Sequence, residues 1–233
     1  MEKTSLHYRG RFPQTLPVPT EIGPAGPEPW EAKRDLVASI GFGRLSTVLP
    51  ALLAPVDIGS PDPATPSSTR QAAVLIPIFR APTGVGLLFT KRSSALSRHA
   101  GEISFPGGGV EAGESYVDAA LRETEEEIGL DRSRLSVIGS LGEMNTVRGE
   151  SSFYTFVAMV DQIGLLKTSD EVDELLPVDL ARLCDPEIYH RESWSGIGFP
   201  RRVMYFYELG GNLLWGATAK LVTDLLNLIA ETL

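Results

Sequence analysis

Short, mostly apolar runs recur along much of the chain between glycines, prolines and polar residues, which is a pattern typical of β-strands. Runs rich in β-branched and aromatic residues, bounded by glycine, proline or polar residues, predict strands over residues 72–79, 85–90, 135–141, 152–160, 171–178 and 202–209. A Pro-Thr-Gly turn separates the first two runs. That spacing predicts a β-hairpin.

One segment between these runs has the period of an amphipathic helix instead. Its mostly apolar face is formed by Val117, Leu121, Thr124 and Ile128. Ser115 followed by Asp118 is a capping signal that predicts the start of the helix, and Gly129 is placed to end it. A second helix is expected after Gly216. Strands on both sides of one strong helix, followed by a closing helix, predict an α/β layered domain.

The first part of the chain has a different composition. Prolines and glycines are frequent over residues 13–29, and Pro61, Pro63 and Pro66 lie among polar residues. Between these stretches, residues 30–53 could form one or two short helices, interrupted by Gly41 and Gly43. We therefore predict an N-terminal extension over residues 1–69 and a layered α/β domain over residues 70–233.

The composition and net charge of the chain exclude some classes of binding partner. The 233 residues are 42% hydrophobic, which is enough for one good core, and the formal net charge is −9. This negative charge argues against sequence-independent binding to nucleic acid and against binding to an anionic membrane surface. An anionic small molecule remains compatible if a metal supplies positive charge. The single Cys184 rules out an internal disulfide framework.

No apolar run of the sequence reaches membrane-spanning length, because the best candidate is broken by Pro50 and Pro55. The N-terminal residues MEKTSLHYRGRF lack the apolar core of a secretory signal. The sequence therefore predicts a cytoplasmic protein without a membrane partner.

Three carboxylates share the polar side of the predicted helix. Glu123, Glu126 and Glu127 are spaced at i, i+3 and i+4, so like charges would oppose one another unless a cation lies among them. Oxygen ligands without histidine or cysteine favour Mg²⁺ or Mn²⁺. A solvated acidic face and a calcium loop are the alternatives. The bordering glycines argue against the first, and the missing D-x-D-x-D-G pattern argues against the second.

The whole segment GGVEAGESYVDAALRETEEEIGL, residues 108–130, matches the template G-x5-E-x7-R-E-x-x-E-E-x-G. It resembles the Nudix box, and Thr124 stands where that family usually has an aliphatic residue. The resemblance implies a metal-dependent hydrolase with an α/β/α sandwich fold and a mixed sheet. It also implies that the Gly107 carbonyl completes the metal site, that Glu114 is a ligand or supports one, and that Arg122 orients the carboxylates.

A second motif precedes the box. Residues 87–108, LLFTKRSSALSRHAGEISFPGG, are similar to the signature of coenzyme A pyrophosphatases within the Nudix superfamily. One arginine of the signature falls on Ser97, with Arg98 directly after it. The stretches EVDELLPVDLARL and LLWGATAKLV also look like that subfamily. The resemblance implies hydrolysis of coenzyme A or an acyl derivative to 3′,5′-ADP and 4′-phosphopantetheine, and it is compatible with a homodimer.

The resemblance suggests roles for individual residues. Arg92 and Arg98 could bind phosphates of coenzyme A, because guanidinium groups bind phosphate bidentately. The substrate motif also includes Thr90, Ser93 and Phe105. Glu127 or Glu171 could act as the general base, and the sequence does not choose between them. His99 is expected to pack or hydrogen-bond rather than to bind metal.

Two other functions remain open at this stage. A Nudix enzyme could act on another nucleoside diphosphate derivative, such as ADP-ribose or NADH. The departure from the coenzyme A signature at Ser97 is consistent with that alternative. A non-catalytic module that senses a nucleotide would be expected to lose box glutamates or to carry a DNA-binding domain, and neither feature is recognisable in the sequence.

Overall fold

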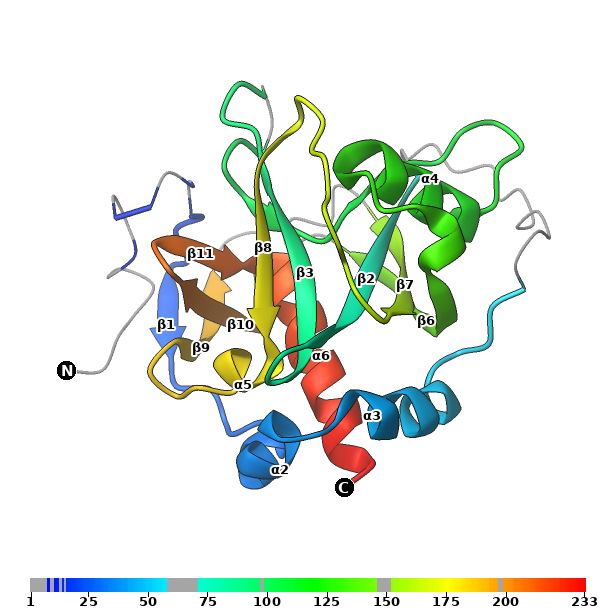
Figure 1. Ribbon diagram of the computed structural model, residues 1–233. Helices are drawn as coiled ribbons and strands as arrows, with labels where there is room; N and C mark the ends of the chain where they lie inside the picture. The colour runs from blue at the N-terminus through cyan, green and yellow to red at the C-terminus, as the bar shows by residue number, and fades with distance from the viewer. Residues whose placement is uncertain are drawn as a thin grey trace.

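The computed structural model describes residues 8, 11–12, 14, 16–57, 71–96, 99–145, 152–196 and 199–233. Within these residues the chain forms two β-sheets that are layered with helices (Figure 1). The larger sheet has seven strands and the smaller sheet has four. Across the described ranges, no helix is both long enough and apolar enough to cross a membrane.

The larger sheet is built around β2 (Gln71–Ala81), whose centre is almost wholly buried. It pairs antiparallel with β3 (Gly84–Arg92), which confirms the predicted hairpin, and parallel with β7 (Ser152–Val160). The sheet is completed by antiparallel pairings of β4 (Ile103–Ser104), β5 (Gly107–Gly109), β6 (Ser136–Asn145) and β8 (Val172–Asp179). The sheet is therefore mixed, as predicted.

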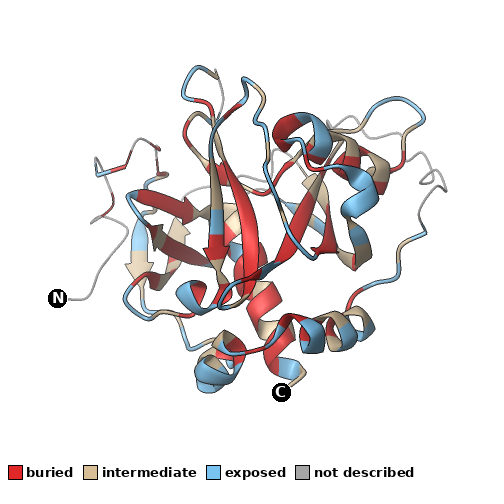
Figure 2. Ribbon diagram, in the orientation of Figure 1, coloured by how far each residue is buried: buried red, intermediate tan, exposed pale blue. Residues whose placement is uncertain are grey.

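Helix α4 (Tyr116–Ile128) covers one face of this sheet. Its apolar side packs on Ala73 and Leu75 of β2 and on Phe156 of β7. The side chain of Ser115 accepts a hydrogen bond from the backbone N–H of Asp118, and Gly129 ends the helix with φ 67°. The predicted helix and its buried face, including Thr124, are thus confirmed. Figure 2 shows the opposite side of α4 as exposed or half-buried.

Helix α6 (Gly216–Glu231) lies behind the larger sheet, as Figure 1 shows. Leu221 and Leu225 of α6 belong to the same buried cluster as Ile76 and Phe89 from the sheet. Helices on both faces of one mixed sheet form an α/β/α sandwich, which confirms the predicted fold class. Two short helical turns connect larger elements: η3 (Arg132–Arg134) lies between α4 and β6, and α5 (Leu180–Leu183) lies between β8 and β9 (Tyr189–Gly196).

The smaller sheet extends the prediction, which included only one of its strands. Its order is β1 (Glu21–Gly23), β9 (Tyr189–Gly196), β10 (Phe199–Leu209) and β11 (Asn212–Trp215). One face joins the main core through Tyr205 and Tyr207. The other face carries Trp194 and Phe206, and Tyr8 from the N-terminal segment covers it.

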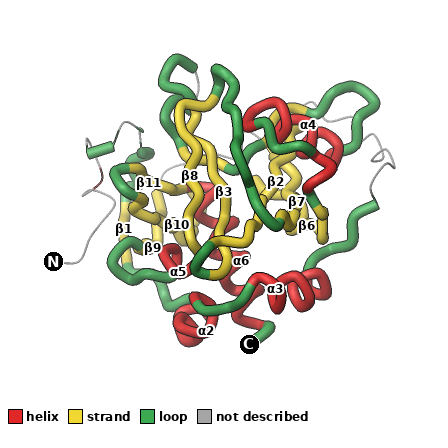
Figure 3. The backbone as a smooth tube through the Cα atoms, viewed as in Figure 1, coloured by secondary structure: helices red, strands yellow, loops and turns green. Residues whose placement is uncertain are grey.

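The short helices expected over residues 30–53 are present (Figure 3). They are η1 (Pro29–Lys33), α2 (Arg34–Ala38), α3 (Phe42–Val48) and η2 (Leu49–Leu52). Gly41 precedes α3 as expected, but Gly43 lies inside that helix, so its predicted role as a break was wrong. Trp30 and Leu45 are fully buried in the main core with residues of α6. This part of the extension is therefore packed into the domain.

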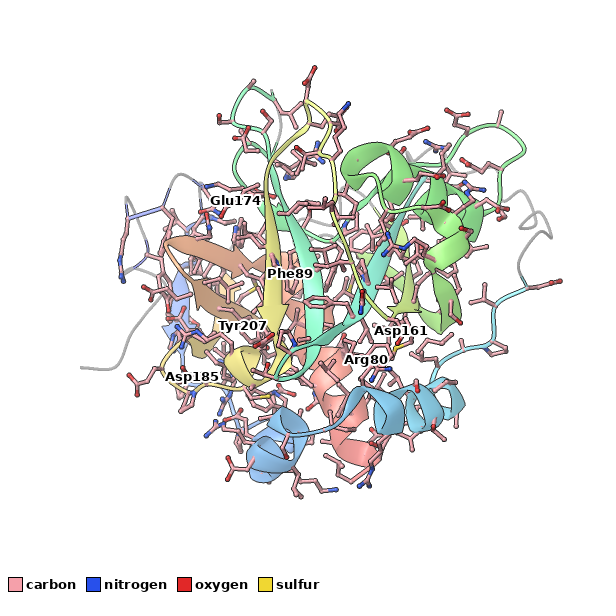
Figure 4. The ribbon with its side chains drawn as sticks, viewed as in Figure 1. Arg80, Phe89, Asp161, Glu174, Asp185 and Tyr207 are labelled. Atoms are coloured by element: carbon pink, nitrogen blue, oxygen red, sulfur yellow. The ribbon has the colours of Figure 1, made fainter. Side chains whose placement is uncertain are left out.

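The lower end of the larger sheet is joined to α3 by one arginine. Arg80 of β2 donates to the Asp161 carboxylate at 2.8 Å, and Figure 4 shows the two side chains together. The guanidinium also lies 4.4 Å from the centre of the Phe42 ring. Such a cation–π contact stabilises the junction of sheet and helix.

Candidate active site

The candidate site lies where β5 passes the polar face of α4. Ala73 of β2 is paired with Gly108, so β5 is fixed beside the sheet centre. A Cβ atom at Gly108 would lie 2.4 Å from the carboxyl carbon of Glu123, and one at Gly107 would lie 2.3 Å from the Ala73 carbonyl oxygen. Gly107 also has φ 151°, which side chains rarely adopt. Only glycine lets the Glu123 carboxylate lie against this strand.

Glu127 is the most buried carboxylate of the site, with 6% of its surface exposed. Its Oε2 accepts a hydrogen bond from the Gly107 backbone N–H at 3.1 Å. Desolvation raises the pKa of Glu127 to about 7; the Gly107 hydrogen bond and Arg92 oppose this rise, whereas Glu123 and Glu171 add to it. A buried carboxylate among like charges is a group that a bound cation would stabilise.

Glu123 has a related environment. Burial raises its pKa above the ordinary value, Arg122 opposes the shift, and the charges of Glu126 and Glu171 add to it. Glu126 itself is mostly exposed, with 60% of its side chain accessible. The structure therefore brings Glu123 and Glu127 together in a site that is partly shielded from solvent, and Glu126 lies at the exposed edge of this site.

Arg122 connects the carboxylates that the sequence predicted. Its Nη1 donates to Glu123 at 3.1 Å and to Glu126 at 3.0 Å, and its Nε donates to Glu114 at 2.9 Å. Nη2 donates to the Gly109 carbonyl oxygen at 2.9 Å. The hydrogen bonds that Arg122 donates to Glu114, the largest cause, and to Glu123 raise the pKa of Arg122 against the opposing effect of burial, and the bond from Arg122 is the largest cause of the lowered pKa of Glu114. This geometry is what an orienting role requires.

Arg92, at the end of β3, faces the same carboxylates from the other side. Its Nη1 lies 3.8 Å from Glu127 Oε1, and its Nη2 lies 3.9 Å from Glu171 Oε2. The Glu171 carbonyl oxygen accepts from the Ser93 backbone N–H at 2.7 Å, which brings the start of β8 beside the end of β3. Glu171 is 60% exposed, so it lies at the open edge of the site.

The other residues of the substrate motif are mostly interior. Thr90 is 1% exposed and its Oγ1 lies 3.1 Å from Ser104 Oγ. Phe105 stacks on Phe89 with ring centres 4.6 Å apart, and Ser93 is buried. Their substrate contacts therefore stay predictions, and their side chains stabilise the strand ends that carry the site.

Two residues of the same motif have a different status. Ser97 and Arg98 lie outside the described residues. His99 has φ 57°, and its Nδ1 lies 2.8 Å from Glu102 Oε2, so it hydrogen-bonds as expected.

Gly108 and Gly109 were not among the predicted site residues. The run of three glycines at β5 was the available signal, although side chains are excluded only at Gly107 and Gly108 and not at Gly109.

The donors of this site fit a hard divalent cation by their chemistry, because they are carboxylate oxygens that destabilise one another's charge. As they stand, no three acidic, histidine or cysteine side chains of the described ranges converge closely enough to hold a metal. Glu126 is turned to Arg122 rather than inward. The predicted ligand set of Glu123, Glu126, Glu127, Glu114 and Gly107 stays a prediction.

Comparison with known proteins supplies the context for this geometry. A family model described as NUDIX domain matches residues 69–194, more than half of the chain. The chain belongs to the Nudix family. Nudix hydrolases generally use divalent metal ions such as Mg²⁺ or Mn²⁺, and they act on nucleoside diphosphate derivatives. The family membership supports the prediction that the chain is a pyrophosphohydrolase.

Its similar relatives include two bacterial proteins named Uncharacterized Nudix hydrolase NudL. The protein of Shigella flexneri serotype 5b is 37% identical over 162 residues, which are 69% of this chain and 83% of the relative. That of Escherichia coli O1:K1 is 37% identical over 158 residues, which are 67% of this chain and 81% of the relative.

Solved structures give weaker matches. A MutT/nudix family protein from Enterococcus faecalis has a TM-score of 0.48 and 15% identity, over 70% of this Nudix chain and 62% of its own. The NUDIX domain of Shewanella oneidensis NrtR, complexed with ADP ribose, has a TM-score of 0.41 and 17% identity, over 52% of this chain and 79% of its own.

Proposed function

We propose that this Nudix enzyme hydrolyses the diphosphate of coenzyme A or its acyl derivatives, giving 3′,5′-ADP and 4′-phosphopantetheine or its acyl form. The observation that carries the proposal is the location of Arg92. This arginine comes from the motif that resembles coenzyme A pyrophosphatases, and its guanidinium lies within 4 Å of Glu127 and Glu171. A phosphate-binding group thus lies next to carboxylates suited to a metal.

In this proposal Glu123, Glu126 and Glu127 hold Mg²⁺ or Mn²⁺, with the Gly107 carbonyl and Glu114 in support. The ion would neutralise charge on the diphosphate oxygens, which otherwise repel a nucleophile. Arg122 orients the carboxylates through its hydrogen bonds to Glu114, Glu123 and Glu126. Arg92 and Arg98 bind the phosphates, and Thr90, Ser93 and Phe105 stabilise the end of β3 that carries Arg92.

The reaction adds water to one phosphorus atom and breaks the P–O–P bridge, so one carboxylate must accept a proton from that water. Glu127 and Glu171 are the two candidates. Burial raises the pKa of Glu127 to about 7. This pKa suits a base near neutral pH, provided that metal binding leaves the carboxylate able to accept a proton. Glu171 lies at the exposed edge, within reach of solvent. Glu171→Gln distinguishes them, because it should abolish turnover only if Glu171 is the base.

A substrate panel tests the function. Purified protein is supplied with Mg²⁺ or with Mn²⁺ and offered coenzyme A, acetyl-coenzyme A, ADP-ribose and NADH, with products identified by mass. Coenzyme A or its thioester should have the highest kcat/KM, because specificity is that ratio. If ADP-ribose is preferred tenfold, the coenzyme A assignment is wrong and the hydrolase assignment stands. Binding without turnover of any compound would favour a sensing module instead.

A further inference from the structure

We propose that Gln14, a residue of the N-terminal extension, is a positioning residue for the substrate side of the site. Its side-chain amide holds the turn at Gly101, directly before β4. Gln14 lies outside residues 69–194, the part that the NUDIX domain model matches. The catalytic consequence rests on the proposed function of Arg92, whereas the effect on the turn can be measured without any substrate.

The segment that carries Gln14 is packed onto the smaller sheet. Tyr8 stacks on Phe206 of β10 with ring centres 5.6 Å apart, and Phe12 lies 6.0 Å from Tyr8. Both rings are buried, as is Leu16 at the other end of the segment. Arg11 adds an ion pair to Glu208 at 2.6 Å. Gln14 is therefore held between buried anchors on either side of it.

The amide of Gln14 connects two segments that are far apart in the sequence. Its Nε2 donates to the Gly101 carbonyl oxygen at 2.9 Å and to the Leu213 carbonyl oxygen at 3.2 Å. The side chain is buried, with 8% of the residue exposed. Two carbonyl acceptors at one end of the amide require the NH₂ group there, which fixes its orientation. Gln14 thereby ties the turn at Gly101 to β11 of the smaller sheet.

The backbone of Gly101 is hydrogen-bonded directly to the backbone of Arg92. Its backbone N–H donates to the Arg92 carbonyl oxygen at 3.1 Å, and the Arg92 N–H donates to the Glu102 carbonyl oxygen at 2.9 Å. The Arg92 side chain is less firmly held, because its nearest carboxylates are 3.8 and 3.9 Å away and its Nε has no partner among the described residues. The position of the guanidinium therefore depends on the backbone of the turn, which Gln14 holds.

The test compares Gln14→Met with Arg11→Met. Methionine has about the length of glutamine but donates no hydrogen bond, so the segment should stay docked while the turn is released. Arg11→Met removes an ion pair of the same segment without touching Gly101. We expect amide hydrogen exchange in peptides covering residues 92–102 to be about three- to tenfold faster in Gln14→Met and unchanged in Arg11→Met.

Kinetics on coenzyme A give the second readout. Gln14→Met should lower kcat/KM by about three- to tenfold, mostly through KM, because the arginine that binds phosphate is less well placed. Unchanged exchange over residues 92–102 would overturn the proposal, and so would faster exchange with unaltered KM and kcat. If Gln14→Met does not fold, Gln14→Glu is used, since its carboxylate faces the same two carbonyl oxygens and should loosen the same peptides.

The two proposals fail in different ways. A wild-type protein that does not cleave coenzyme A disproves the proposed substrate, and the exchange of residues 92–102 still decides whether Gln14 holds the turn. A wild-type protein that cleaves coenzyme A, with Gln14 variants that match it in exchange and KM, disproves the role of Gln14 alone.

Discussion

The carboxyl group of Glu123 lies directly against the backbone of Gly108, so closely that a Cβ atom there would be 2.4 Å from its carboxyl carbon. Gly108 comes from strand β5 and Glu123 from helix α4, and the pairing of β5 with β2 fixes the distance between them. The position of one candidate ligand thus depends on the absence of a side chain on a neighbouring strand.

Gly108→Ala should displace this carboxylate. The atoms in the way are the far end of a flexible side chain, so the fold should survive while Glu123 moves. A misplacement of about 1 Å can cost on the order of 100-fold in rate, and we expect kcat to fall about 10- to 100-fold. Gly109→Ala is the matched control, because a Cβ there meets nothing within 4 Å. Equal activity of the two variants would show that the location of Glu123 is unimportant.

The buried Glu127 predicts how stability depends on pH in metal-free protein. Its pKa is raised from about 4.5 to about 7, so the folded state favours the protonated form. The stabilisation is fully present below pH 4.5 and is lost as pH rises through 7, by about 3 kcal/mol at most. Urea unfolding in EDTA should show this fall between pH 4.5 and 7. Glu127→Gln should flatten it, and an identical slope in that variant would contradict the assignment.

Arg98 offers a test of the substrate motif, in a segment outside the described residues. If Arg98 takes the place of the arginine expected at Ser97, it should bind a phosphate of coenzyme A, in particular the 3′-phosphate. Charge-assisted contacts of this kind contribute roughly 1.5–3 kcal/mol. Arg98→Ala should lower kcat/KM about 10- to 100-fold on coenzyme A and much less on dephospho-coenzyme A. Equal losses on both substrates would assign Arg98 to the diphosphate or to the fold, and rescue by Ser97→Arg would support shared duty.

Trp30 tests whether residues 1–69 are separable from the domain. It is fully buried, and its ring meets Tyr189 edge-on at 5.1 Å. Trp30→Ala should lower the free energy of unfolding by about 3–5 kcal/mol in urea titrations. Val18→Ala is the control, because Val18 is 66% exposed and should change stability by less than about 0.5 kcal/mol. A loss below about 1 kcal/mol at Trp30 would favour a dispensable extension.

The sequence by itself determined the features that depend on near neighbours. Helix α4 was predicted with its start at Ser115 and its end at Gly129, because capping and the apolar stripe involve residues three or four positions apart. The hairpin of β2 and β3 followed from its turn. The spacing of the box glutamates also predicted a shared helical face, and the resemblance of residues 108–130 to the Nudix box predicted the family.

The formation of the smaller sheet depends on tertiary contacts rather than on local sequence preference. Strands β1 and β11 have only three and four residues, and β9 reads YHRESWSG, a mostly polar pattern without clear alternation. Such strands have little local preference of their own. They form because their neighbours supply hydrogen bonds and because the main core and Tyr8 cover the two faces.

The details of the site were also decided by tertiary structure. The sequence named Arg92, Glu127 and Glu171, but their approach requires β3, α4 and β8 to meet. The contact of Gln14 with Gly101 spans 87 residues, and no local pattern encodes it. Sequence spacing determines which residues share an element, because helix and strand periods are fixed. Which elements meet is decided by burial of their apolar faces, and this sets the distances and the desolvation on which the chemistry depends.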